Sequence, residues 1–218
     1  MARRIRGSAG IVKVGSQLFT AEGPRAVQRL AGLGFGVFLD LKFHDIPNTV
    51  AGAVAAAADL PGVRMMTVHT SGDLAMMRAA KEAIAGRKKR PALLGVTILT
   101  SMDAAALRRV GLSGSPGARV LALARLAKKA GLDGVVASAH EVTAIRRACG
   151  PRFLIVVPGI RPATAAANDQ ARVATPAEAI RAGASYLVVG RPITGAPDPA
   201  AAAQSIANEI AIASVRRS

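Results

Sequence analysis

Short apolar runs alternate with longer amphipathic segments along almost the whole chain, and this alternation constrains the fold more than any other feature. The apolar runs have the length and composition of buried strands, and the segments between them have helical periodicity. Such a pattern predicts repeated β/α units around a parallel sheet. The predicted strands are residues 11–14, 37–41, 65–69, 92–98, 134–137, 153–157 and 186–190, and the predicted helices are residues 17–31, 49–59, 74–85, 118–130, 141–148, 176–182 and 199–212.

Two architectures can be built from such units. An open doubly wound sheet binds its ligand at a glycine-rich turn after the first strand, but Lys13-Val-Gly-Ser at that position lacks this fingerprint. A closed β/α barrel has eight strands, one more than predicted here. We therefore expect an α/β fold of the TIM-type (β/α) barrel class that lacks its first strand. Residues 1–218 are expected to form one domain, in which residues 1–10 fit neither strand nor helix and are poorly ordered.

Composition narrows the class of protein. Hydrophobic residues make up 51% of the chain and charged residues 19%, a globular balance rather than a disordered one. No uncharged apolar run reaches the 18 residues of a membrane span, and Lys13 interrupts the apolar stretch that a signal peptide would need. The single cysteine, Cys149, excludes an internal disulfide. These features predict a cytoplasmic protein with no membrane partner.

The net charge of +16 favours anionic partners, either a nucleic acid or a small molecule. Only Arg87-Lys-Lys-Arg90 forms a compact basic run, and aromatic residues for base stacking make up just 3% of the chain. A solvated basic surface is the commoner origin of such a run. We therefore predict no nucleic-acid partner; the charge would also help draw in an anionic small substrate, but by itself it decides little.

Charged side chains interrupt the apolar run of residues 37–43, Val-Phe-Leu-Asp-Leu-Lys-Phe. Residues two apart in a strand point the same way, so Asp40 and Lys42 should share one face, and Asp45 in the following loop should be close enough to join them. Buried charges are costly unless they are paired, and barrels keep their catalytic groups at the carboxyl ends of strands. The alternative to a catalytic cluster is a set of ion pairs on the surface. Lys13 lies at a similar strand end, where a snorkelling lysine is the alternative to a functional one.

The last two predicted strands are followed by segments suited to phosphate binding. Loops at this position in a barrel commonly hold phosphate through backbone N–H groups and a cation. Pro158 and Arg161 follow one strand, and Gly190 and Arg191 follow the other. The long stretch between residues 158 and 175 is predicted to be a lid.

The histidines do not predict a metal centre. No second His or Cys stands at ligand spacing from His69, so we assign it a structural role near the rim and predict no metal. His44 is given no catalytic role.

Together these motifs resemble the orotidine 5′-phosphate decarboxylase family. The resemblance covers residues 11–207 and is strongest over residues 40–49, Asp-Leu-Lys-Phe-His-Asp-Ile-Pro-Asn-Thr. Asp-x-Lys-x-x-Asp alone is shared with the Mg²⁺-dependent 3-keto-gulonate 6-phosphate decarboxylases and hexulose phosphate synthases, which remain an alternative, as does a non-catalytic nucleotide-binding remnant. Further matches in order are Lys13-Val-Gly, His69-Thr-Ser-Gly, Thr97-Ile-Leu-Thr-Ser, Pro158-Gly-Ile-Arg-Pro and Gly190-Arg-Pro-Ile-Thr.

The resemblance implies conversion of orotidine 5′-phosphate to UMP without a cofactor. Lys42 would be the acid that protonates C6, Asp40 would lie beside the departing carboxylate, and Lys13 would touch the ribose. Asp45 would reach the site of a neighbouring subunit, which implies a homodimer. The implied substrate-binding residues are Ile46 and Thr49 beside Asp45, Thr100 at the base, Gln170 on the lid, and Pro158, Arg161, Gly190 and Arg191 at the phosphate.

The chain departs from this family at its front. Family members begin with a strand that carries an aspartate for the ribose hydroxyls, and no such run precedes Lys13. The departure implies a chain truncated at its front and a barrel with two unpaired strand edges.

Overall fold

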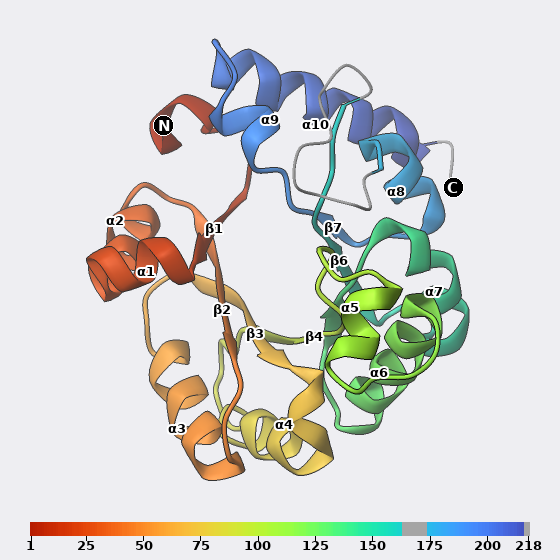
Figure 1. The fold of residues 1–218 in the computed structure, drawn as a ribbon. Coiled ribbons are helices and arrows are strands. Elements are labelled where there is room, and N and C mark those ends of the chain that lie inside the picture. Colours follow the sequence, from red (N-terminus) through yellow and green to blue (C-terminus); the bar gives the residue numbers. More distant parts are fainter. Residues whose placement is uncertain (163–173, 216–218) are drawn as a thin grey trace.

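The computed structural model describes residues 1–162 and 174–215. Its seven strands are all parallel and form one curled sheet in sequence order, with the helices on the outside (Figure 1). This confirms the predicted barrel-type α/β fold with seven strands. The strands are β1 (Ile11–Gly15), β2 (Gly36–Phe43), β3 (Val63–His69), β4 (Ala92–Val96), β5 (Gly134–Val136), β6 (Leu154–Val157) and β7 (Tyr186–Leu187).

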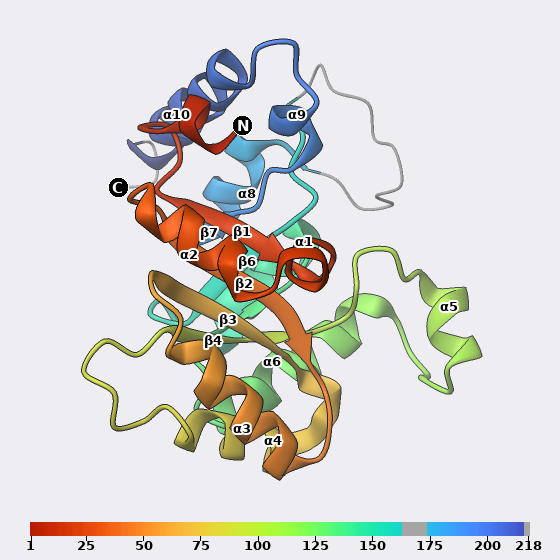
Figure 2. The same ribbon diagram turned by 90° about the vertical axis from the view of Figure 1, so that its left-hand side faces the viewer.

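The helices follow the predicted alternation with two differences. The predicted helix 17–31 is two helices, because Gly23 at φ 59° breaks the first and Pro24 begins the second. The short helices α5 and α9 were not predicted; Figure 2 shows α5 standing away from the barrel at the end toward which β2 points. The helices are α1 (Ser16–Glu22), α2 (Pro24–Gly32), α3 (Pro47–Ala58), α4 (Asp73–Glu82), α5 (Ala104–Arg109), α6 (Pro116–Lys129), α7 (Val142–Cys149), α8 (Pro176–Ala182), α9 (Arg191–Thr194) and α10 (Pro199–Val215).

Alternation along the strands divides the apolar side chains between two cores. Leu39 and Met66 face the helices and belong to the large outer core. Phe38 and Met65, their neighbours in sequence, point into the barrel and belong to a smaller inner core. The inner core fills the barrel below the strands' carboxyl ends and leaves the mouth free for polar groups.

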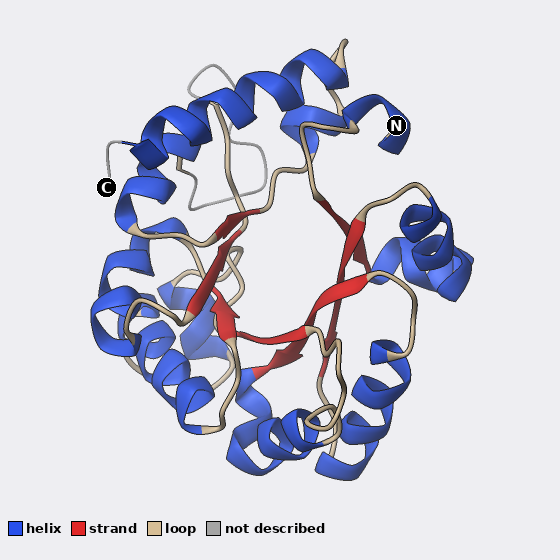
Figure 3. Cartoon of the chain, turned by 180° about the vertical axis from the view of Figure 1, so that it is seen from behind, coloured by secondary structure: helices blue, strands red, loops and turns tan. Residues whose placement is uncertain are grey.

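The ring of strands is open between β1 and β7 (Figure 3). Within residues 1–162 and 174–215, no strand pairs with the outer edge of either. The N-terminal segment lies beside α10 at this gap: Ile5 packs with Phe35 and Ala203, and Arg4 forms an ion pair of 3.1 Å with Asp198. Residues 1–10 were expected to fit neither strand nor helix, but residues 2–5 form a 3₁₀ helix because Ile5 has this apolar contact to bury.

None of the helices that the structure describes is long and apolar enough to cross a membrane.

Two residues of the basic run 87–90 form ion pairs within the fold. Arg87 pairs with Asp59, and Arg90 pairs with Asp133 at 2.8 Å.

Asp133, just before β5, joins several elements at the amino ends of the strands. Its carboxylate accepts hydrogen bonds from Lys81 of α4 at 2.7 Å, from Arg90 at 2.8 Å and from the backbone N–H of Leu93 in β4 at 2.8 Å. Burial alone would raise the pKa of this carboxyl, but the hydrogen bonds from Arg90 and Lys81 outweigh it and hold the pKa below its ordinary value.

Replacing Asp133 with Asn should lower the free energy of unfolding by about 2–4 kcal/mol at pH 7, because two partly buried cations lose their carboxylate. A carboxyl with a depressed folded-state pKa stabilises the fold above its unfolded pKa of about 3.9, and this contribution is lost as the pH falls through the folded value. Urea unfolding should therefore show the wild-type advantage shrinking below about pH 4. Glu22→Gln, which breaks an exposed ion pair with Arg29, is the control, and an equally small effect of both variants would contradict the prediction.

Candidate functional site

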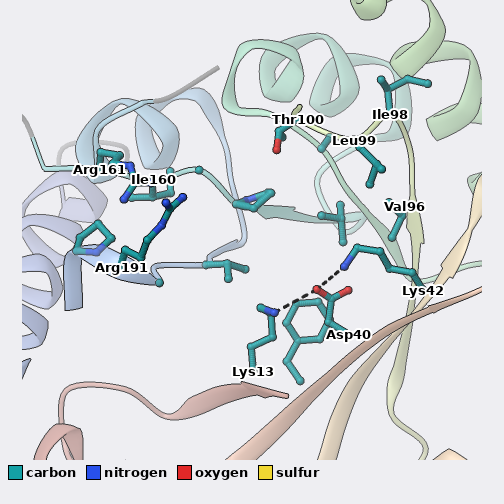
Figure 4. Close-up of a pocket in the computed structure, with 18 residues that line it drawn as sticks. Lys13, Asp40, Lys42, Val96, Ile98, Leu99, Thr100, Ile160, Arg161 and Arg191 are labelled. Carbon is teal, nitrogen blue, oxygen red and sulfur yellow. Dashed lines mark hydrogen bonds and ion pairs between the residues drawn. The ribbon is translucent and has the colours of Figure 1, made fainter. Parts of the chain in front are cut away.

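A cavity of about 300 Å³ opens at the carboxyl ends of the strands (Figure 4). It lies above the inner core, and its walls come from β1, β2, β4 and β5 and from the segments that follow β4 to β7. This is where β/α barrels hold their functional groups. Eight residues singled out from the sequence line it: Lys13, Asp40, Lys42, Thr100, Pro158, Arg161, Gly190 and Arg191.

A carboxylate between two ammonium groups forms one end of the cavity. Oδ2 of Asp40 lies 2.8 Å from Nζ of Lys42 and 3.5 Å from Nζ of Lys13. The Asp40 side chain is only 11% exposed, whereas about a third of each lysine side chain is exposed. The carboxylate is thus desolvated, held by two cations, and leaves both ammonium groups open to the cavity (Figure 4).

The backbone departs from regular strand geometry where it presents Lys42. Lys42 has φ 54°, a left-handed conformation that a residue with a side chain rarely adopts. The pairing of β2 with β3 also shifts, so that the step from Leu39 to Phe43 on β2 matches the step from Met66 to Val68 on β3. The two charged side chains meet as predicted, but through this irregularity rather than through simple strand alternation.

Thr67 of β3 completes the cluster, and the sequence interpretation missed it. Its hydroxyl accepts a hydrogen bond from the backbone N–H of Lys42 at 2.9 Å and donates one to Oδ1 of Asp40 at 3.0 Å. The side chain is fully buried. The only sequence signal was a polar residue inside an apolar strand.

Two arginines form the opposite end of the cavity. Figure 4 shows Arg161 and Arg191 together, across the cavity from Asp40 and the lysines. Arg161 is 7% exposed, and among the residues described its Nε has no hydrogen-bond partner. A buried donor without a partner is costly, and an anion in the cavity would satisfy it. Gly190, directly before Arg191, leaves open space around its backbone.

Three of the predicted site residues do not line this cavity, and a fourth is not among the residues described. Asp45, Ile46 and Thr49 lie outside it, in the loop after β2 and the first turn of α3, and all three are exposed. Ile46 is 67% exposed. Gln170, together with most of the predicted lid, lies outside the residues that the structure describes.

His69 and His44 lie side by side, with ring centroids 5.4 Å apart. Burial lowers the pKa of His69, and the neighbouring His44 and Lys42 lower it further, so the ring is neutral at pH 7. In the described part of the chain, no group of three or more His, Cys, Asp or Glu residues could hold a metal ion.

Inorganic phosphate should bind at the arginine end of the cavity and raise the melting temperature of the protein. Arg191→Ala should weaken this binding by about 10-fold or more, because charge-assisted hydrogen bonds to phosphate are lost. A thermal-shift titration measures both effects. Arg152→Ala removes an exposed cation outside the cavity and serves as the control for net charge; equal weakening in the two variants would argue against a phosphate site here.

The chain matches a known protein family over most of its length. The model of the family described as "Orotidine 5′-phosphate decarboxylase / HUMPS family" matches residues 1–206. A curated protein of Nitrosococcus oceani named orotidine 5′-phosphate decarboxylase is 58% identical over 199 residues, which cover 91% of this chain and 85% of that protein. One of the same name from Anaeromyxobacter dehalogenans is also 58% identical, over 94% of this chain and 89% of that protein.

Solved structures agree with this match. The crystal structure of orotidine 5′-phosphate decarboxylase from Lactobacillus acidophilus is similar with a TM-score of 0.81 and 41% identity, covering 91% of this chain and 86% of that one. The structure of the same name from Pyrococcus horikoshii has a TM-score of 0.77 and 25% identity, covering 96% and 91%.

Proposed function

The chain belongs to the orotidine 5′-phosphate decarboxylase / HUMPS family, and we propose that it converts orotidine 5′-phosphate to UMP in pyrimidine nucleotide synthesis. Its relatives make it a carboxy-lyase. One observation carries the choice of substrate: a single cavity has the Asp40–lysine cluster at one end and two arginines at the other. The substrate has the matching form, with a carboxylate-bearing base at one end and a phosphate at the other.

The proposed pose follows from this match of charges. The phosphate binds Arg161, Arg191 and the backbone around Gly190, with Pro158 beside it. Thr100 contacts the base, and Gln170 adds a contact to the phosphate from the predicted lid. Binding energy from the remote phosphate can then offset the energy of placing the substrate carboxylate beside Asp40.

The proposed chemistry uses residues of the cluster alone. The bond between C6 and the carboxylate breaks, carbon dioxide leaves, and the electron pair remains on C6. The ammonium group of Lys42 donates a proton to C6 to give UMP. Lys42 and Lys13 are already held as cations where negative charge develops, which stabilises the transition state electrostatically. The step as proposed takes no electrons or groups from a metal or an organic cofactor.

The proposal also includes a homodimer in the cytoplasm. Asp45, Ile46 and Thr49 are exposed and stand next to the cluster in sequence without lining the cavity of their own chain. An exposed isoleucine beside a carboxylate suits a subunit interface. We propose that these three residues complete the site of the partner subunit. The relatives' names favour this substrate over the sugar-phosphate reactions of related enzymes.

Lys42→Ala should reduce kcat for orotidine 5′-phosphate by more than about 10⁴-fold, because it removes both the proton donor and a preformed cation. Spectrophotometric turnover measures the loss, and UMP titration should show that phosphate anchoring is retained. Lys129→Ala removes an exposed lysine of α6 as the control. Retained turnover would exclude Lys42 as the acid, and a wild-type chain with no turnover would refute the substrate.

Asp45→Ala should also inactivate the enzyme, and mixing it with Lys42→Ala should restore activity. Each mixed dimer contains one intact site, formed by Lys42 of one subunit and Asp45 of the other. Random reassociation puts half of the subunits in mixed dimers, so about a quarter of wild-type activity should return. If both residues served the same chain's site, mixing would restore nothing.

A further inference from the structure

Thr67 is hydrogen-bonded to Asp40 and Lys42, but unlike them it is not exposed to the cavity. It is fully buried and does not line the cavity, so it cannot touch a ligand there. Met66 and Val68 on either side face the outer core, so the Thr67 side chain points into the barrel. It therefore lies directly beneath Asp40 and Lys42.

The hydroxyl of Thr67 fixes how the Asp40 carboxylate is turned. Both ammonium groups contact Oδ2, and the Thr67 hydroxyl is the donor to Oδ1. A carboxylate with each oxygen engaged from a different side cannot rotate about its Cβ–Cγ bond without breaking a charge-assisted hydrogen bond. Oδ2 is thus held between the two lysines.

The same hydroxyl supports the unusual backbone of Lys42. Where β2 and β3 lose register, the backbone N–H of Lys42 leaves the regular ladder of the sheet. Thr67 lies on β3 between the two residues where pairing stops and resumes, and its oxygen accepts that N–H at 2.9 Å. A left-handed conformation at a non-glycine residue persists only when its surroundings impose it.

We propose that Thr67 is a positioning residue for decarboxylation, whose single hydroxyl sets the orientation of the Asp40 carboxylate and holds the backbone from which Lys42 reaches C6. The proposal rests on the proposed function. A hydroxyl group has one proton to donate and two lone pairs to accept, so it can make both contacts at once. A valine in its place has nearly the same shape and can make neither.

Thr67→Val should lower kcat by about 10- to 100-fold, the effect of one hydrogen bond to a charged group, while the Kd of UMP stays within about twofold. Thr67→Ser keeps the hydroxyl and should return kcat to within about twofold of wild type. The matched control is Thr70→Val, since Thr70 is equally buried and donates its one hydrogen bond to the carbonyl of Val96. Thr70→Val should lower the melting temperature about as much as Thr67→Val but leave kcat within about twofold of wild type.

A crystal structure of Thr67→Val tests the same proposal without turnover. The contacts of Lys42 and Lys13 with Asp40, 2.8 and 3.5 Å in the native protein, should change by more than about 0.5 Å. If these distances and the positive φ of Lys42 persist, or if kcat falls no more than in Thr70→Val, Thr67 is not a positioning residue. An inactive wild type would refute the proposed substrate, and these distances would still decide the role of Thr67. Should Thr67→Val not fold, Thr67→Cys, with a weakly hydrogen-bonding thiol, makes the same comparison.

Discussion

The contact of one carboxylate with two ammonium groups is the interaction on which the site depends. Asp40 is almost fully shielded from water, and a desolvated charge is tolerated only when partners surround it. The partners come from two strands besides its own: Lys13 from β1 and Thr67 from β3. The parallel sheet brings these strands side by side, and so the order of the strands fixes the composition of the cluster.

The two ends of the barrel carry different roles. At the amino ends of the strands, Asp133 is fully engaged by Lys81 and Arg90, and its contacts serve stability. At the carboxyl ends, Lys13 and Lys42 share one carboxylate and keep part of their surface in the cavity. An excess of cations over carboxylates is electrostatically unfavourable, and an anion bound in the cavity would offset the repulsion.

The seven strands and the meeting of Asp40 with Lys13 and Lys42 could be predicted from the sequence, because alternation and charges in apolar runs are local signals, and the family could be predicted from its motifs. Non-local features could not. Thr67 acquires its place only through the shifted pairing of β2 with β3, which no periodicity reveals. The packing of Ile5 against Phe35 and Ala203 likewise depends on residues almost 200 positions apart. Conversely, the exposure of Asp45 could not be deduced from its spacing, because the chain turns into α3 directly after it.

Because β1 and β7 do not pair, the sheet is an open ring of strands rather than a closed barrel. Backbone hydrogen bonds join each neighbouring pair of strands from β1 to β7. Beside the gap, among the residues that the structure describes, side chains make the link: Ile5 packs with Phe35 and Ala203, and Arg4 pairs with Asp198. Lys13 lies on the edge strand β1, and Arg191 begins α9, a few residues after the other edge strand, β7. A ligand that contacts both residues would therefore bridge the gap between the two edge strands. Occupancy of the cavity would thus add a link between the two edge strands that the backbone hydrogen bonds of the sheet do not make.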